Sequence, residues 1–191
     1  MTVSINGSWA GISQIGSKRY TCGHCGNNIS SQVGYRAQTH SAFTASIYIC
    51  HDCNGPTLFS GADQVPGPLL GGNIESLPDD IRALYDEIRN STTTNSYTAA
   101  VLAARKLLMH IAVQCGADPG KNFVTYVDYL VDNNYTPPNS KAWIDQIRTI
   151  GNEANHEIVI MDEARASSII RLIEMLLKFN YEFPALAPSE T

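Results

Sequence analysis

The residues with the clearest chemical potential are four cysteines that stand in two CxxC pairs. Cys22 and Cys25 form the first pair, Cys50 and Cys53 form the second, and 24 residues separate the pairs. This spacing is typical of zinc ribbons, in which two tight turns point four thiolates at one tetrahedral Zn²⁺. Four protein sulfurs leave no coordination position open for water or substrate, so the predicted zinc ion is structural rather than catalytic.

The other interpretation of these thiols is two disulfide bonds. The first 16 residues contain neither a basic start nor a continuous apolar stretch, so the sequence shows no secretory signal. Thiols stay reduced in the cytoplasm, which favours metal binding over disulfides. We therefore expect a cytoplasmic protein with one structural zinc. We also expect no membrane association, because no apolar run approaches the ~20 residues of a membrane span.

A second group of chemically capable residues lies nearer the C-terminus. Arg148, Asn152 and His156 are spaced at i, i+4 and i+8, so on a helix they would form one stripe about 12 Å long. His156 could then transfer a proton near neutral pH while Arg148 holds a phosphate through paired hydrogen bonds. In the other interpretation, Asn152 and His156 bond to neighbouring helices and Gly151 permits close packing. The residues alone favour this structural interpretation.

Two modules are predicted to position these groups, with a boundary near residue 75. Residues 1–75 are rich in Gly, Ser, Thr and Asn, and the β-prone segments 18–21 and 44–49 each lead into one CxxC pair. Metal ligation would supply much of the folding free energy of this module, on the order of 10 kcal/mol. Residues 61–73 carry repeated Pro and Gly and are predicted to form an extended linker.

Residues 76–191 contain a series of helix signals, because apolar residues recur at helical spacing between capping residues and breakers. Five helices with short connections favour an antiparallel bundle, so the predicted fold class is mainly α, with a small β zinc ribbon in front. Cys115 lies on an apolar stripe and is predicted to be a core residue rather than a reactive thiol. The predicted helices span residues 77–89, 96–115, 119–133, 141–157 and 162–181.

The charge distribution argues against nonspecific nucleic-acid binding. The net charge is −5, and no basic run is longer than two residues. Residues 1–75 carry three Lys or Arg against three Asp or Glu, and the remainder carries ten against fifteen. A protein that grips the phosphate backbone normally has a basic face. A local patch on the ribbon remains as one hypothesis for DNA or RNA binding, and its residues are Lys18, Arg19, Tyr20, Tyr35 and Arg36.

The sequence also resembles a known family. Beyond the CxxC pairs, the matching segments are residues 56–59, 77–78, 84–89, 96–100, 105–109, 141–148, 151–157, 174–179 and 181–184. In these segments the chain is similar to the domain-of-unknown-function 4145 family. The resemblance implies a bacterial or archaeal protein whose helical part is HEPN-like. HEPN proteins often dimerise, and they recur in toxin–antitoxin, restriction and anti-phage systems.

The resemblance also implies a test for ribonuclease activity. HEPN ribonucleases carry an Arg followed four to six residues later by a His, with a polar residue usually just after the Arg. Asn152 and His156 match the polar residue and the His, but Gly151 stands where four intervening residues would place the Arg. Arg148 leaves seven residues between itself and His156. The Arg part of the motif is therefore not matched.

Two main functional hypotheses remain at the level of sequence. The first is a zinc-ribbon and HEPN-like protein that acts as a binding or interaction module, as a homodimer with an RNA or protein partner, in anti-phage defence, restriction or a toxin–antitoxin system. The second is a metal-independent HEPN-type ribonuclease that uses His156 with Asn152 and Arg148 across a dimer. The broken Arg spacing and the acidic helical part favour the first hypothesis.

Overall fold

The described residues form two compact units. The computed structural model describes residues 7–38, 42–138, 140, 143–145, 147–149 and 159–186. The N-terminal unit comprises residues 1–70 together with 92–95, and the helical unit comprises residues 71–91 and 96–191. Thr92, the last residue of the first helix, and the three residues after it are thus assigned to the N-terminal unit.

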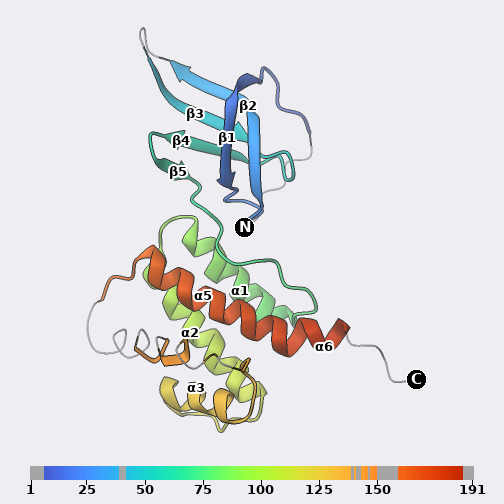
Figure 1. The fold of residues 1–191 in the computed structure, drawn as a ribbon, viewed down its shortest axis with the longest axis vertical. Helices are drawn as coiled ribbons and strands as arrows, with labels where there is room; N and C mark the ends of the chain where they lie inside the picture. Colours follow the sequence, from blue (N-terminus) through green and yellow to red (C-terminus); the bar gives the residue numbers. More distant parts are fainter. Residues whose placement is uncertain are drawn as a thin grey trace. The chain divides into compact units, whose positions relative to one another are not determined.

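The N-terminal unit is a five-stranded antiparallel sheet in which each strand pairs with the next one along the chain (Figure 1). Short connections between consecutive strands suffice for this order. Strand β4 shows the alternation expected of a half-buried strand, since Thr57 and Phe59 are buried and their neighbours are not. The strands are β1 (Ser13–Thr21), β2 (Asn28–Gln38), β3 (Phe43–Ile49), β4 (Pro56–Ser60) and β5 (Asp63–Val65).

A small aromatic core lies on one face of this sheet. The rings of Tyr20, Tyr48 and Phe59 have centroids between 5.1 and 6.2 Å apart and meet at steep angles. Edge-to-face contacts of this kind contribute about 0.5–1.5 kcal/mol beyond the area that the rings bury. Cys22 and Cys50 are completely buried in the same cluster. The aromatic core therefore packs directly against two of the four cysteines.

The prediction of a mainly α fold is wrong. In the described part of the chain a five-stranded antiparallel sheet precedes the helices, so the fold mixes α and β structure. The sequence prediction found only segments 18–21 and 44–49 as strand-prone, and it assigned residues 61–73 to a linker although β5 lies among them. Strand β2 contains two Ser, two Gln and one Gly among its 11 residues. Backbone hydrogen bonds to both neighbours hold β2 in the sheet whatever its side chains are, so its composition gave little signal.

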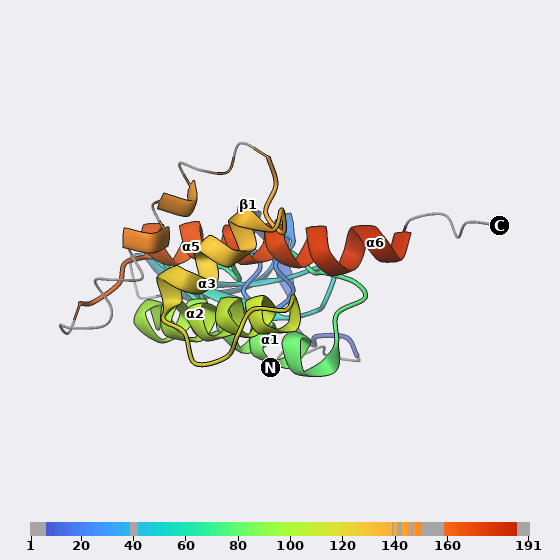
Figure 2. The ribbon, with the colours of Figure 1, turned by 90° about the horizontal axis from the view of Figure 1, so that it is seen from below.

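Among the residues that the structure describes, the helical unit has one long composite helix, three further helices and short helical stretches at 143–145 and 147–149. Helix α5 (Glu163–Leu177) continues without interruption into a π-helical turn, η1 (Lys178–Glu182), and then into α6 (Phe183–Leu186). In Figure 2, α6 extends beyond the neighbouring helices. The others are α1 (Asp79–Thr92), α2 (Tyr97–Gln114) and α3 (Phe123–Asp132). No helix among those described combines the length and the apolar character that a membrane span requires.

Local capping explains where two of these helices begin. The side chain of Asn122 accepts a hydrogen bond from the Thr125 amide at 2.9 Å, which starts α3 at Phe123 rather than at the predicted position 119. Asp162 caps α5 in the same way, accepting from the Arg165 amide at 2.8 Å. The predicted fourth helix is seen only as helical residues 143–145 and 147–149, and the rest of its predicted span, 150–157 included, lies outside the described residues.

The core of the helical unit forms where α2 packs against α3 and α5. Its completely buried side chains include Leu107, Ile111 and Ile169. Arg89 and Arg105 are both buried in this unit. Arg89 is 7% exposed, and its Nη2 donates to the Gly71 carbonyl at 3.0 Å. Helix α1 is thereby fixed to the segment that precedes it.

Candidate metal centre

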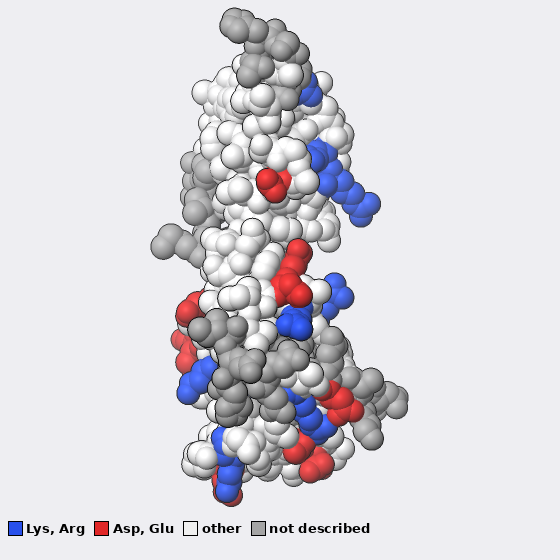
Figure 3. Space-filling model, turned by 90° about the vertical axis from the view of Figure 1, so that its left-hand side faces the viewer, with Lys and Arg blue, Asp and Glu red and all other residues white. Residues whose placement is uncertain are grey.

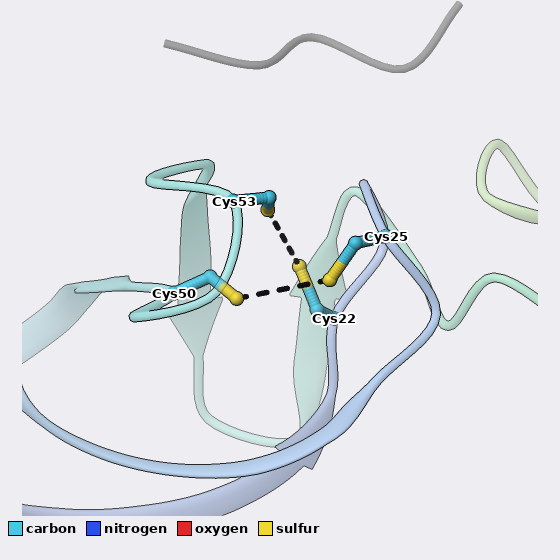
Figure 4. A group of neighbouring side chains, drawn as sticks. All are labelled: Cys22, Cys25, Cys50 and Cys53. Atoms are coloured by element: carbon cyan, nitrogen blue, oxygen red, sulfur yellow. Dashed lines mark hydrogen bonds between the residues drawn. The ribbon is translucent and has the colours of Figure 1, made fainter. Parts of the chain in front are cut away.

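The four CxxC cysteines come together at one point of the N-terminal unit. Their sulfur atoms all lie within 4.8 Å of one another. The Sγ atoms of Cys22 and Cys53 are 3.8 Å apart, as are those of Cys25 and Cys50, and both distances join one pair to the other (Figure 4). A tetrahedron with Zn–S bonds of about 2.3 Å has edges of about 3.8 Å. The cluster could therefore hold one metal ion in tetrahedral coordination.

The two turns that carry the cysteines have the same backbone hydrogen bonds. In the first turn, the Gly26 amide donates to the Cys22 carbonyl at 2.9 Å, and the Cys22 amide donates to the Asn27 carbonyl. In the second, the Asn54 amide donates to the Cys50 carbonyl at 2.9 Å, and the Cys50 amide donates to the carbonyl five residues later. Gly26 and Asn54, at equivalent positions, both have positive φ, as closing each turn requires.

A histidine that the sequence analysis did not single out joins the two turns. His24 Nε2 donates to the Pro56 carbonyl at 2.8 Å, just after the second CxxC pair. The ring lies so close to Gly55 that a Cβ there would be 2.4 Å from His24 Cδ2. A second link runs between Asn27 and Asp52, whose side chains are 2.8 Å apart. The sequence offered one signal for the His24 contact, namely a glycine directly after the second turn.

Protons and a metal ion compete for these sulfurs. Burial raises the pKa of Cys25 to about 11, and burial together with the charge of the Cys22 thiolate raises the pKa of Cys53. Burial acts the same way on Cys50, but the backbone N–H groups of Cys53 and Asp52 outweigh it and lower the pKa of Cys50. Without a cation, Cys25 and Cys53 hold their protons at neutral pH, and a divalent metal would displace them.

With four sulfur ligands, such a metal would be closed to substrate. The donor set suits a soft or borderline cation, and its role would be to join the two turns rather than to polarise a reactant. Cys22 and Cys50 would ligate from within the aromatic core, while Cys25 and Cys53 lie at its edge. The chemistry that this centre supports is therefore stabilisation of the fold.

The residues predicted to form a catalytic stripe are not seen as a group. Arg148 lies in the helical unit, where its guanidinium is ion-paired with Asp128 of α3 and, at 2.5 Å, with Asp145. Asn152 and His156 lie outside the described residues. Arg105 of α2, another cation of this unit, is 6% exposed and lies over the Phe123 ring at 4.6 Å. Burial lowers its pKa.

The residues of the hypothetical nucleic-acid patch are mostly engaged within the N-terminal unit. Tyr20 is buried in the aromatic core, and Lys18 lies over the Phe59 ring at 4.4 Å. Tyr35 donates to the Ala10 carbonyl and Arg36 donates to the Ile15 carbonyl, whereas Arg19 is exposed. Figure 3 shows one face of the molecule, on which basic and acidic side chains are interspersed and no large basic surface is visible.

Cys115 was predicted to be a core residue, and the structure places it at the edge of the core. It caps the C-terminal end of α2 and is half-buried. Burial raises the pKa of its thiol, so the reactive thiolate is disfavoured. It is separate from the metal-site cysteines and belongs to the helical unit.

Fold and site together define a two-part protein in which a cysteine-clustered sheet precedes a helical unit. Residues 86–190, more than half of the chain, match the sequence profile of a domain of unknown function, DUF4145. The chain belongs to this family, which confirms the resemblance read from the sequence; its HEPN-like character remains a prediction. Searches of curated proteins and of solved structures give no significant match.

Proposed function

We propose that the four cysteines hold one structural Zn²⁺ and that the chain serves as a binding module without enzymatic activity. The tetrahedral sulfur spacing and the all-thiolate donor set support zinc. A closed zinc site organises a surface and does not act on a substrate. Binding by the helical unit would then be the activity of the protein, with RNA or protein as the partner and with two copies of the chain in the functional particle.

The observation that carries this proposal is the ion pairing of Arg148. A group that steadies a phosphate needs a positive charge available to the substrate. The Arg148 guanidinium instead contacts two carboxylates, those of Asp128 and Asp145. Those two negative charges more than neutralise it, so a phosphate would have to displace a carboxylate to bind there. This arrangement favours a structural role for Arg148 over a catalytic one.

The rival function is the ribonuclease that uses His156, Asn152 and Arg148. A fluorogenic single-stranded RNA incubated with the zinc-loaded full chain distinguishes the two. We expect the wild type to cleave the RNA no faster than His156→Ala does. We also expect a lower melting temperature for His156→Ala, because loss of a structural histidine would leave its polar partner unpaired at a cost of about 1–3 kcal/mol. Cleavage that disappears in an equally stable His156→Ala variant would overturn the proposal.

The cellular setting and the oligomeric state are further parts of the proposal. The setting is the one that the family resemblance implies: anti-phage defence, restriction or a toxin–antitoxin system. Affinity capture from the native cell, with both RNA and protein identified, tests it, and specific enrichment of components of such a system is the expected result. Sedimentation at micromolar concentration should give about twice the chain mass of 20.8 kDa, and a monomer at all concentrations would contradict the homodimer.

A further inference from the structure

An apolar groove runs along the composite C-terminal helix of the helical unit. Its volume is about 390 Å³. Met175, Phe179 and Phe183, one turn apart, line one side, and Pro137 and Trp143 line the other. Phe179 is 37% exposed and Phe183 is 56% exposed, so large aromatic surfaces face solvent here. Exposed aromatic surface in a groove is a common feature of protein interaction sites.

The π-helical turn is what brings these side chains into line. In η1 the Phe183 amide donates to the Lys178 carbonyl, five residues earlier, so the turn holds one more residue than an α-helical turn. The Asn180 side chain donates to the Leu176 carbonyl at 2.7 Å and to the Tyr135 carbonyl at 3.2 Å. These bonds fix the turn to the chain that follows α3. π-turns inside α-helices are frequently found at functional sites.

The other face of the same turn is anchored to the helical unit. The Tyr181 hydroxyl donates to Gln114 Oε1 at 2.8 Å, and Glu182 accepts from the Glu75 amide at 2.7 Å. On the opposite wall, Trp143 Nε1 donates to Ser168 Oγ at 3.3 Å. With these anchors in place, the exposure of Phe179 and Phe183 is imposed by the fold and is not a fraying of the helix end.

The charged residues at the groove indicate the charge that a binding partner should carry. Three charged residues line it: Arg171, Glu174 and Lys178. Glu174 and Lys178 pair with each other at 2.8 Å, whereas Arg171 is exposed and makes no ion pair within the described residues. The groove therefore has a net charge of +1 beside an apolar floor. In a two-fold contact between copies this patch would face itself, so like charges would meet.

We propose that this groove binds an amphipathic helix of a partner protein. The helix would place apolar side chains at i and i+4 against Phe179 and Phe183, and a carboxylate of the helix would pair with Arg171. The open groove admits a helix from the side and leaves the polar face of that helix in water. This inference rests on the proposed binding function and names the partner class for the helical unit.

The experiment uses a displayed library of random peptides and the only two tryptophans of the chain as reporters. Peptides are selected on the zinc-loaded full chain and counter-selected on Phe183→Ser. An enriched peptide is then synthesised and titrated against the Trp9→Phe variant, in which Trp143 is the only tryptophan. We expect enriched peptides with apolar residues at i and i+4 and at least one Asp or Glu, and a saturable change in Trp143 emission.

One charge-reversal variant of the protein, one charge-reversed peptide and one matched control test the details. Arg171→Glu should weaken the acidic peptide at least tenfold and should improve binding of the same peptide with Lys in place of Glu. Leu102→Ser is the control for Phe183→Ser: it changes an exposed apolar residue that is 49% exposed on α2 and lies outside the groove, and it should leave the affinity unchanged. Equal binding of the Glu and Lys peptides, or no enrichment at all, would overturn the inference.

The other occupants give different results, and each would also overturn it. A second copy in the groove would make Phe183→Ser monomeric. If the chain's own residues 187–191 occupied the groove, a variant truncated after Leu186 would bind the peptide more tightly than the full chain. A fatty acid would displace the peptide from the groove when dodecanoate is added. The proposed function is tested separately: cleavage of RNA lost in a stable His156→Ala variant refutes the binding module, whereas failed peptide selection refutes only the groove.

Discussion

Loss of the metal should unfold the N-terminal unit and leave the helical unit folded. The substitution Cys25→Ser tests this, because it removes one of the four sulfurs that lie within 4.8 Å of one another. Cys25 is at the edge of the aromatic cluster, so the substitution removes a ligand without opening a large cavity. Cys115→Ser is the matched control, because it replaces a half-buried thiol that belongs to the helical unit and is not one of the four clustered cysteines.

The expected magnitude follows from comparing the metal with the core. Structural zinc sites contribute on the order of 10 kcal/mol or more to folding at neutral pH. The buried cluster of the N-terminal unit comprises Ile15, Ile29 and the three aromatic rings besides two of the cysteines themselves. A small core of this kind supplies at most about 3–5 kcal/mol. The free energy that metal binding contributes to folding is larger than the free energy that the small core contributes. We therefore expect the N-terminal unit to unfold when the metal is removed.

The two tryptophans report on the two units separately. Trp9 Nε1 donates to the Asn54 carbonyl at 2.9 Å in the second cysteine turn, and Trp143 belongs to the helical unit. In the Trp143→Phe background, a strong chelator or the Cys25→Ser substitution should shift Trp9 emission to the red. In the Trp9→Phe background, Trp143 emission should not change. Metal analysis should give about one zinc per chain for the wild type and Cys115→Ser, and none for Cys25→Ser.

Either of two results would refute this reasoning. Protein purified without chelator that contains no zinc would show that the sulfur cluster is not a metal site in solution. A metal-free Cys25→Ser protein with native Trp9 emission would show that the aromatic core alone is sufficient, and that the comparison of magnitudes is wrong.

Three further predictions concern single groups. Gly55→Ala should displace the His24 ring, because its Cβ would lie 2.4 Å from His24 Cδ2, and should lower the unfolding free energy by about 1–3 kcal/mol in urea titrations; an unchanged midpoint would count against the packing. Arg89→Met should lower the unfolding free energy by about 1–3 kcal/mol in the same titration, because it removes the donor to the Gly71 carbonyl. An unchanged midpoint would show that water replaces this hydrogen bond and would contradict the prediction. Metal affinity should rise between about pH 6 and 8, because a thiol with a pKa near 11, that of Cys25, must lose its proton to bind; a chelating indicator measures this, and a flat profile would contradict it.

The clustering of the four cysteines was the part that the sequence predicted best, and the reason is physical. Two CxxC pairs bring their ligands together through local turns, so residue spacing alone carries most of the geometry. The two turns share one hydrogen-bond pattern, in which Gly26 and Asn54 take the positive φ. The His24 contact with Pro56 was missed because it joins residues 32 positions apart, which spacing within a turn does not reveal.

The sheet was underpredicted because its stability does not come from the composition of each strand. Strand β2 pairs with both β1 and β3, and its buried positions include Ser31, whose hydroxyl donates to the Ile49 carbonyl at 2.7 Å. In the sequence, a serine at this position indicates a turn or an exposed residue, whereas in the structure it is buried and its hydrogen bond connects two strands. Periodicity found the helices more readily, since α2 and α5 bury long apolar stripes.

The groove was not predictable from helical periodicity, because the π-turn changes that periodicity. Extending α5 as an ideal α-helix assigns residue 180 and those after it to the wrong face, since one extra residue rotates the remainder by about 100°. The rotation allows Asn180 and Tyr181 to bond inward while Phe179 and Phe183 stay at the surface. A helix selected only for stability would bury those two rings. Their exposure on an anchored turn is therefore the feature of the helical unit that most favours a bound partner.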